Sequence, residues 1–256
     1  MIHSRLDGIA AANALKCDDT QSVPTRNAAG KAALKILALD TSTEYCSVAL
    51  WRSGDIDARE AHAGQRHSEL LLGMVDELLV RHKLRTEELD GLAFGQGPGS
   101  FTGLRIACGV TQGLALAAGL PVVGIVTLLA MAEAAHAERV VCCLDARMHE
   151  IYHAAYAKSG DGWVTVCEPG LWAPAESPLL PAGTWHGCGS GFAAYREALM
   201  RRYDGRLGGV TPQLFPHARD IARLAAPLLE QGKGTDAALA APLYVRDKVA
   251  LRSDER

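Results

Sequence analysis

The sequence predicts an α/β protein built from two lobes that repeat one structural pattern. Short apolar runs typical of buried strands alternate with longer segments whose apolar residues follow a helical period. Two of the apolar runs end in aspartate, at Asp40 and Asp145, and each is followed by a turn and a second strand. No sequence identity links the two halves, so the repeat is one of pattern alone. We therefore expect a duplicated fold with a boundary near residues 135–139.

The composition is that of an ordinary folded protein. Of the 256 residues, 48% are hydrophobic and 21% are charged, and the formal net charge is −3. This balance excludes a strongly basic chain that holds nucleic acid by its phosphates alone. None of the seven cysteines forms a C-x-x-C pair, and Cys46, Cys108, Cys142 and Cys143 have apolar neighbours. We expect reduced, buried thiols in a cytosolic protein, and no cysteine zinc site.

Two stretches resemble targeting or membrane signals without meeting their requirements. Residues 1–33 are polar and small and lack periodicity, which predicts a disordered leader. Residues 106–132 carry no charge and are long enough to cross a bilayer. However, Pro121 and its neighbours interrupt this stretch, and VVGIV after it is typical of a buried strand. We expect neither a membrane span nor a secretion signal.

The N-terminal lobe is predicted over residues 34–137. The apolar runs ALKILALD, GLAFG and LPVVGIV are typical of strands, and two further strands follow the turn after Asp40. The helix around HSELLLGMVDELL has Ser68 as a candidate N-cap and an unusually wide apolar face. The expected strands are 33–40, 42–52, 54–63, 89–95 and 120–126, and the expected helices are 66–84, 100–119 and 127–138.

The C-terminal lobe is predicted over residues 138–256. It opens with the apolar strand ERVVCCLDA, a turn at Arg147 and Met148, and a partner strand EIYHAAYA. A third strand, WVTVCEP, follows, and two segments with a helical period come later in the chain. The expected strands are 138–146, 150–157 and 163–169, and the expected helices are 191–203 and 216–232.

The turn after the first strand, ALDTST, is the first candidate site. It places Asp40 at a strand end with Thr41 and Ser42 behind it. In kinases built from paired βββαβα units, the same turn lies under the phosphates of a nucleotide. Such a turn ordinarily contains a glycine so that backbone N–H groups face the phosphate, and this one contains none. A hairpin turn closed by its own side chains is the alternative, and the residues leave both open.

The glycine-rich loop GQGPGS, with Gly97, Gly99 and Ser100, leads from a strand into a helix. This arrangement suits anion binding, because free N–H groups and the positive end of the helix dipole point the same way. The spacing nevertheless matches neither a P-loop nor a dinucleotide fingerprint. In the helix, Gly109 and Gly113 are four residues apart and leave a smooth strip. We interpret this helix and the preceding one as a candidate partner face.

The segment HEIYH at 149–153 matches the H-E-x-x-H zinc motif, which would use His149, Glu150 and His153. That motif requires a helix. Here the segment follows an apolar strand across a short turn, and its residues alternate as in a strand. On a strand, residues four apart lie roughly 13 Å from each other, at ~3.3 Å per residue, which is too far for one metal ion. A strand hairpin is therefore the favoured interpretation.

These segments together resemble the TsaB (YeaZ) family. The resemblance runs from about residue 34 to residue 249 and is carried by ILALDTST, HSELLLGMVDELL, GPGSFTGLRIACG, LDARMHEIYHAAY and the tail APLYVRDKVA. It implies the actin/Hsp70/sugar-kinase superfold, with a duplicated βββαβα architecture in two lobes. It also implies a non-catalytic subunit that binds and activates the TsaD catalytic subunit, which threonylcarbamoylates the anticodon-adjacent adenosine of tRNA.

The resemblance also implies partners and a location. It predicts a heterodimer with a TsaD-type subunit, a TsaE-type ATPase, contact with tRNA through the complex, a homodimer in isolation, and a cytoplasmic protein. No cofactor is required, and weak binding of ATP or ADP in the complex is compatible with the fold. The family's catalytic subunit holds its metal with an H-x-x-x-H pair on the first helix. This chain has His67 there but leucine at position 71, so no metal site is expected.

The predicted site residues fall into two groups. The first is a partner interface on the helices 67–83 and 100–118, and the second is a vestigial nucleotide site. The interface residues are Leu70, Met74, Leu78, Leu104, Cys108, Gly109 and Gly113. The nucleotide-site residues are Asp40, Thr41, Ser42, Gly97, Gly99, Ser100 and Asp145.

Two enzymatic hypotheses stay open beside the accessory subunit. One is a small-molecule kinase of the same superfold, which requires Asp40 and Asp145. The other is a zinc metallopeptidase that uses the H-E-x-x-H segment. A serine hydrolase is not supported, because no G-x-S-x-G motif is present.

Overall fold

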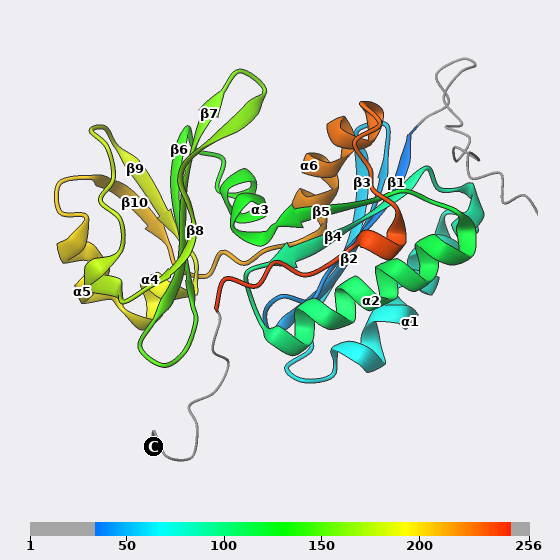
Figure 1. Cartoon of the computed structure of the whole chain (residues 1–256), viewed down its shortest axis with the longest axis horizontal. Coiled ribbons are helices and arrows are strands. Elements are labelled where there is room, and N and C mark those ends of the chain that lie inside the picture. Colours follow the sequence, from blue (N-terminus) through cyan, green and yellow to red (C-terminus); the bar gives the residue numbers. More distant parts are fainter. Residues whose placement is uncertain (1–33, 247–256) are drawn as a thin grey trace, which may run out of the picture.

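Two five-stranded mixed sheets lie side by side in the computed structural model, which describes residues 34–246 (Figure 1). The predicted leader 1–33 lies outside the described residues. In the first half of the chain the elements agree with the predicted order. They are β1 (Lys35–Asp40), β2 (Tyr45–Arg52), β3 (Asp55–His62), α1 (His67–Arg81), η1 (Thr86–Glu88), β4 (Gly91–Gly97), α2 (Phe101–Ala118), β5 (Val122–Val126) and α3 (Thr127–Ala134).

The second half contains more elements than the sequence pattern predicted. Two short strands were missed, and the helix expected over 191–203 is split into two at Tyr195, which has φ −128° and ψ 40°. The elements are β6 (Arg139–Asp145), β7 (Ile151–Ser159), β8 (Gly162–Trp172), η2 (Pro174–Glu176), β9 (Trp185–Cys188), α4 (Ser190–Ala194), α5 (Arg196–Arg202), β10 (Leu207–Thr211), α6 (Ala218–Glu230) and η3 (Ala237–Leu239).

The strand order confirms the predicted duplication. The first sheet has the order β3-β2-β1-β4-β5, and the second has the corresponding order β8-β7-β6-β9-β10. In each sheet the first three strands along the chain pair antiparallel, and the last two add in parallel. The connections differ, because η2 and the short pair α4 and α5 stand where the first half has α1 and α2.

The two sheets exchange helices. α3 follows the first sheet in the chain, yet its Leu128 and Met131 pack with Val140 and Leu144 of the second sheet. α6 follows the second sheet but covers one face of the first, in a core with Ile36, Ala38 and Ala93. Figure 1 shows α3 and α6 between the sheets. The division at residue 137 stays a prediction, since each half supplies a helix to the core of the other.

The opposite face of the first sheet is covered by α1 and α2. Their buried residues form one core with Leu37, Leu39 and Leu92. The N-cap of α2 is Ser100, and its hydroxyl accepts a hydrogen bond from the Gly103 amide at 3.3 Å. Ser68 is not the cap of α1, because that helix begins after Arg66 and no side chain caps it.

α2 has a mean hydropathy of 1.2, so by length and composition alone it could cross a membrane. A core helix passes the same test, and α2 packs on β4 with six of its residues buried. Its first turn lies directly on the β1–β2 turn. A side chain at Gly103 would overlap the carbonyl oxygen of Thr41, whereas nothing lies within 4 Å of the corresponding position at Gly109.

Two identical substitutions in α2 are expected to have opposite effects. Gly103→Ala should lower the free energy of unfolding by about 1–3 kcal/mol, because the added methyl group forces the helix off the turn. Gly109→Ala should raise it by about 1 kcal/mol, because alanine is the better helix former and the methyl group points into open space. Urea denaturation of the two variants measures both values. A neutral Gly103→Ala would contradict the close packing of α2 on the turn.

Candidate functional site

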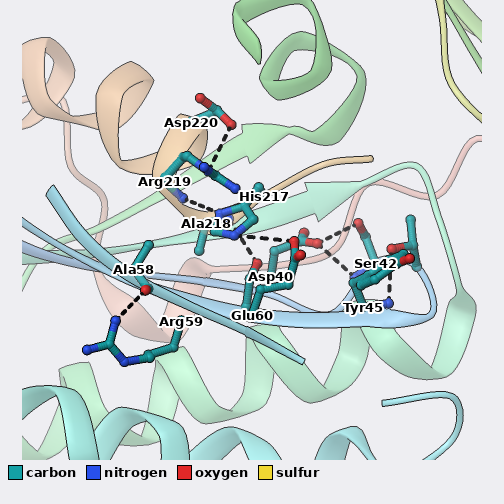
Figure 2. Close-up of polar contacts among 12 residues, drawn as sticks. Asp40, Ser42, Tyr45, Ala58, Arg59, Glu60, His217, Ala218, Arg219 and Asp220 are labelled. Atoms are coloured by element: carbon teal, nitrogen blue, oxygen red, sulfur yellow. Dashed lines mark hydrogen bonds and ion pairs between the residues drawn. The ribbon is translucent and has the colours of Figure 1, made fainter. Parts of the chain in front are cut away.

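The β1–β2 turn is buried and closed by its own hydrogen bonds. Asp40, Thr41 and Ser42 have at most 1% of their surface exposed. The amide and hydroxyl of Ser42 donate to Asp40 Oδ2 at 3.3 and 3.0 Å, as Figure 2 shows. The Thr41 hydroxyl donates to the carbonyl of Gly103 at 2.7 Å. These hydrogen bonds match the second of the two interpretations, a hairpin turn in which the side chains, rather than a ligand, pair with the polar groups of the turn.

The glycine-rich loop lies on this turn. The amide of Ser100 donates to the carbonyl of Ser42 at 2.7 Å, and a side chain at Gly99 would overlap that same carbonyl. Gly97 has φ 125°, a region that favours glycine, and a Cβ there would lie 2.6 Å from the carbonyl oxygen of Leu243. The glycines therefore let segments of this chain approach one another closely.

Asp40 combines full burial with an incomplete set of partners. Its Oδ1 has no hydrogen-bond partner within residues 34–246 and lies where a side chain at Gly95 would be. Burial raises the pKa of Asp40 to about 7, and the two hydrogen bonds from Ser42 offset only part of that effect. The carboxyl therefore gains a proton in the neutral range, unlike an exposed carboxylate that binds a metal.

Asp145 occupies the equivalent position in the second sheet, at the β6–β7 turn. Its carboxylate accepts from the amide of Arg147 at 2.9 Å and from the hydroxyl of Tyr195 at 3.2 Å. The next residues, Arg147, Met148 and His149, all have positive φ, between 54° and 62°. Each such residue costs about 1–2 kcal/mol when it is not glycine. The surrounding contacts must therefore hold this turn in place.

The hypothesis of a zinc site is wrong for the segment 149–153. His149 lies in the turn, and His153 lies four residues on in the strand β7, so the motif is not on a helix. His153 is fully buried beside Tyr203, and burial lowers the pKa of its ring to about 4. Glu150 is bound to Arg246. Within residues 34–246, no group of three metal-binding side chains is present.

The N-terminus of α6 packs on the face of the first sheet that lies opposite α1 and α2. Nδ1 of His217 accepts from the Arg219 amide at 3.0 Å, and its Nε2 lies 3.3 Å from Glu60 (Figure 2). The Ala218 amide donates to the Ser47 hydroxyl at 2.9 Å. Burial lowers the pKa of His217 to about 4. A polar pocket of about 370 Å³ lies beside this contact, lined by side chains of both charges.

The last described residues, 240–246, form a C-terminal strap that joins the two halves. The amide of Leu243 donates to the carbonyl of Gln96 at 2.7 Å, and Gln112 donates to the carbonyl of Ala240 at 3.0 Å. Farther along, Arg105 donates to the hydroxyl of Tyr244 at 2.8 Å. Figure 1 shows the strap in red, running from beside α2 toward the second sheet.

The strap ends in a clamp on the strained turn. Arg246 donates to the carbonyl of Ala146 at 3.0 Å and to the carboxylate of Glu150 at 2.6 Å. The side chain of Arg246 is 12% exposed and that of Glu150 is 36% exposed, so the arginine is largely buried while the carboxylate also faces solvent. Arg246 lies in the tail segment APLYVRDKVA that carries part of the family resemblance, but it was not among the predicted site residues. Its role depends on a contact between residues about a hundred positions apart.

The predicted interface helices carry both core and surface residues. Leu78, Leu104 and Cys108 are buried in the core of the first sheet, which corrects the expectation that these side chains face outward. Leu70 and Met74 are half-buried at the edge of that core. Gly109 and Gly113 are exposed, and nothing lies within 4 Å of where their side chains would be. The smooth strip on α2 is thus present on the surface.

Comparison with known proteins shows the family to which the chain belongs. Residues 61–250 match the family model described as TsaD, tRNA N6-adenosine threonylcarbamoyltransferase. The tRNA threonylcarbamoyladenosine biosynthesis protein TsaB of Escherichia coli (strain K12) is 36% identical over 239 residues, which cover 86% of this chain and 97% of that protein. The chain belongs to the TsaB family. The protein of the same name from Haemophilus influenzae is also 36% identical, over 86% of this chain and 96% of its own.

Solved structures agree with membership of the TsaB family. YeaZ from Pseudomonas aeruginosa superposes with a TM-score of 0.76 at 36% identity and covers 82% of this chain and 99% of its own. An uncharacterized Pseudomonas aeruginosa protein described as similar to peptidase YEAZ gives 0.77 at 36% identity, over 83% and 100%. With the strand order, these matches confirm the predicted actin-like, two-lobed α/β fold.

In this TsaB-family chain, Asp40 is expected to make stability depend on pH. The pKa of Asp40 is about 7 in the folded chain against 3.8 as a model value, so the folded state keeps a proton that the unfolded state releases. The contribution of Asp40 to the free energy of unfolding is most favourable below about pH 4. It falls by about 4 kcal/mol as the pH rises to about 7. Urea denaturation at pH 4 and pH 8 should show that Asp40→Asn removes this fall. The same pH dependence in both proteins would mean that Asp40 ionises normally.

Arg246→Ala is expected to release the strained turn of the TsaB-family chain. It leaves Glu150 and the Ala146 carbonyl without a donor, which should lower the free energy of unfolding by about 2 kcal/mol. Amide exchange at residues 147–149 should become faster. The control is Arg147→Ala, since that side chain is 86% exposed and its surface ion pair contributes at most about 1 kcal/mol. Equal effects of the two substitutions would contradict the clamp.

Proposed function

We propose that this chain takes part in tRNA threonylcarbamoyladenosine biosynthesis as a non-catalytic subunit that binds and activates a TsaD-type catalytic subunit. Its relatives in the TsaB family carry the name of that biosynthesis. The match to the TsaD family model supports a pair of subunits with related folds. Related folds favour pairing through equivalent surfaces, as in a pseudo-symmetric dimer.

The observation that carries the proposal is the surface of α2 and its neighbour α1. Gly109 and Gly113 are four residues apart and leave room for a helix backbone to approach closely. Gly73 on α1 is also exposed, with open space at its Cβ position. Leu116 is 59% exposed farther along α2. A strip of glycines flanked by apolar side chains is suited to a helix of a partner protein.

The proposed absence of catalysis rests on the state of the two candidate centres. Asp40 is fully buried and bonded to Ser42, so it is not available to bind a metal or a phosphate in this conformation. On α1, His67 is buried and Leu71 lies in the core, so the pair of histidines that the family's catalytic subunit uses is missing. These features support an accessory role for the chain.

The proposal extends to partners and location. A TsaE-type ATPase would complete the complex, tRNA would be contacted through the complex, and the free chain would form a homodimer through the same helix face. No cofactor would be required, and ATP or ADP would bind weakly within the complex. The chain would act in the cytoplasm, where tRNA is modified.

The test is reconstitution of the modification with the catalytic subunit, the ATPase subunit, threonylcarbamoyl-adenylate and tRNA, with and without this chain. We expect threonylcarbamoyladenosine to form only when the chain is added, and no product from the chain alone. Product formation that does not depend on the chain would refute the proposal. ATP turnover by the chain alone, lost in Asp40→Asn, would support the kinase hypothesis instead.

Substitutions on the glycine strip test the interface separately. Gly109→Trp and Gly113→Trp place a large side chain in the strip, so they should weaken binding of the catalytic subunit at least about tenfold, or about 1.4 kcal/mol. Both variants should fold, because nothing lies within 4 Å of either Cβ position. The control is Leu179→Trp, at an exposed residue of the other lobe. Calorimetric titration measures all three, and unchanged binding by both glycine variants would place the interface elsewhere.

A further inference from the structure

Exposed apolar side chains gather where the C-terminal strap meets α2. Leu239 of η3, just before the strap, is 74% exposed, and Leu116 of α2 is 59% exposed. Phe101 of α2 and Tyr244 of the strap are also exposed. These are four of the eleven large hydrophobic residues that are exposed within residues 34–246, so the strap and α2 concentrate them. An apolar surface of this kind commonly binds a partner protein.

The strap runs along α2 in the opposite direction, which brings these side chains together (Figure 1). Near the start of the helix, the hydroxyl of Tyr244 accepts from Arg105 at 2.8 Å, and its ring centre lies 5.4 Å from that of Phe101. Farther along the helix, the carbonyl of the residue after Leu239 accepts from Gln112 at 3.0 Å, one turn before the exposed leucine of α2. We call Phe101, Arg105, Leu116, Leu239 and Tyr244 the strap surface.

Arg105 is the one charged side chain of the strap surface. α2 has no other charged residue, and residues 237–245 have none. Arg105 forms no ion pair within residues 34–246. Its guanidinium carbon lies 3.8 Å from the centre of the Phe101 ring. A protein that covers this cation removes water from it, so that protein must supply a carboxylate in return.

The strap surface continues the glycine strip of the proposed interface. Gly109 lies one turn after Arg105, and Gly113 lies three residues before Leu116, so the four share one side of α2. At ~1.5 Å per residue, about 16 Å separate Arg105 from Leu116 along the helix. One end of this side is cationic and the other is apolar, which distinguishes the two directions in which a partner helix can lie on it.

We propose that the TsaD-type subunit covers the strap surface together with the glycine strip, through a helix that places a carboxylate on Arg105 and apolar side chains on Leu116 and Leu239. This inference rests on the proposed function, because it specifies how the same partner is bound. The unlike ends of the surface set the direction of that helix. The strap is then part of the interface and not only a link between the two lobes.

Leu239→Lys tests the apolar end. It places a charge against apolar side chains of the partner, so it should weaken binding of the catalytic subunit at least about tenfold in calorimetric titration. The control is Leu179→Lys, at an exposed leucine of the other lobe, which should bind normally. Both variants should melt within about 2 °C of the unaltered chain, because both leucines are exposed. Equal affinities of the two variants would overturn the proposal.

Two substitutions of Arg105 test the cationic end. Arg105→Gln removes the charge and should weaken binding about tenfold or more, as expected for a lost hydrogen bond between charged groups. Arg105→Lys keeps the charge but loses the Nε–H that binds Tyr244, and it should bind within about threefold of the unaltered chain. Added salt should weaken the unaltered chain more than Arg105→Gln. Equal losses in the two variants would mean that Arg105 only holds the strap, which would overturn the proposal.

The unaltered chain and Gly109→Trp separate this inference from the proposed function. If the unaltered chain does not bind the catalytic subunit, both fail. If Gly109→Trp weakens binding while Leu239→Lys and Arg105→Gln bind normally, the proposed function stands and this inference alone fails. Sedimentation of the free variants checks for a different occupant. Loss of self-association with unchanged binding of the catalytic subunit would assign the strap surface to a second copy of the chain and overturn the proposal.

Discussion

The close contact between the glycine-rich loop and the β1–β2 turn is the constraint on which most of the structure depends. The Ser42 carbonyl accepts from Ser100, and the Thr41 hydroxyl reaches Gly103, so two turns that could face a ligand satisfy each other. This contact sets where α2 begins. It also leaves the Gln96 carbonyl free to bond the strap, which then crosses to the second sheet. Backbone groups that must be paired thus determine the shape of the interlobe region.

The two strands that end in aspartate have the same place in their sheets, but the turns that follow them differ in burial and in backbone conformation. In the first sheet the turn is buried and the aspartate is enclosed by neighbouring backbone. In the second sheet the turn stays nearer to solvent and is held in a strained conformation by Asp145 and by Arg246 from the strap. Strain of this kind persists only where several contacts act together. The duplicated strand order therefore does not imply duplicated chemistry at the two strand ends.

Much of the fold could be predicted from the sequence, because long strands and helices carry a periodic signal. The runs ending at Asp40 and Asp145 predicted both sheets. The strands β9 and β10 were missed since WHGC and LGGVT are short and rich in glycine, which gives no alternation. The surface of α2 could not be separated from its core side, because that helix is apolar over most of its circumference. The strap has almost no regular secondary structure, and its contacts join residues far apart in the chain, so no local pattern reveals them.

The exchange of helices between the sheets has a consequence for synthesis of the chain. All strands of the first sheet are made before the second sheet begins, but the helix that covers one of its faces, α6, is made after the second sheet is complete. Until then Ile36, Ala38 and Ala93 lack the helix that covers most of their face, although the opposite face is already packed under α1 and α2. Between the completion of β5 at Val126 and the start of α6 at Ala218, a nascent chain therefore carries an exposed apolar sheet face, which is the kind of surface that chaperones bind. The core of the first lobe is therefore completed only after the second sheet has been made.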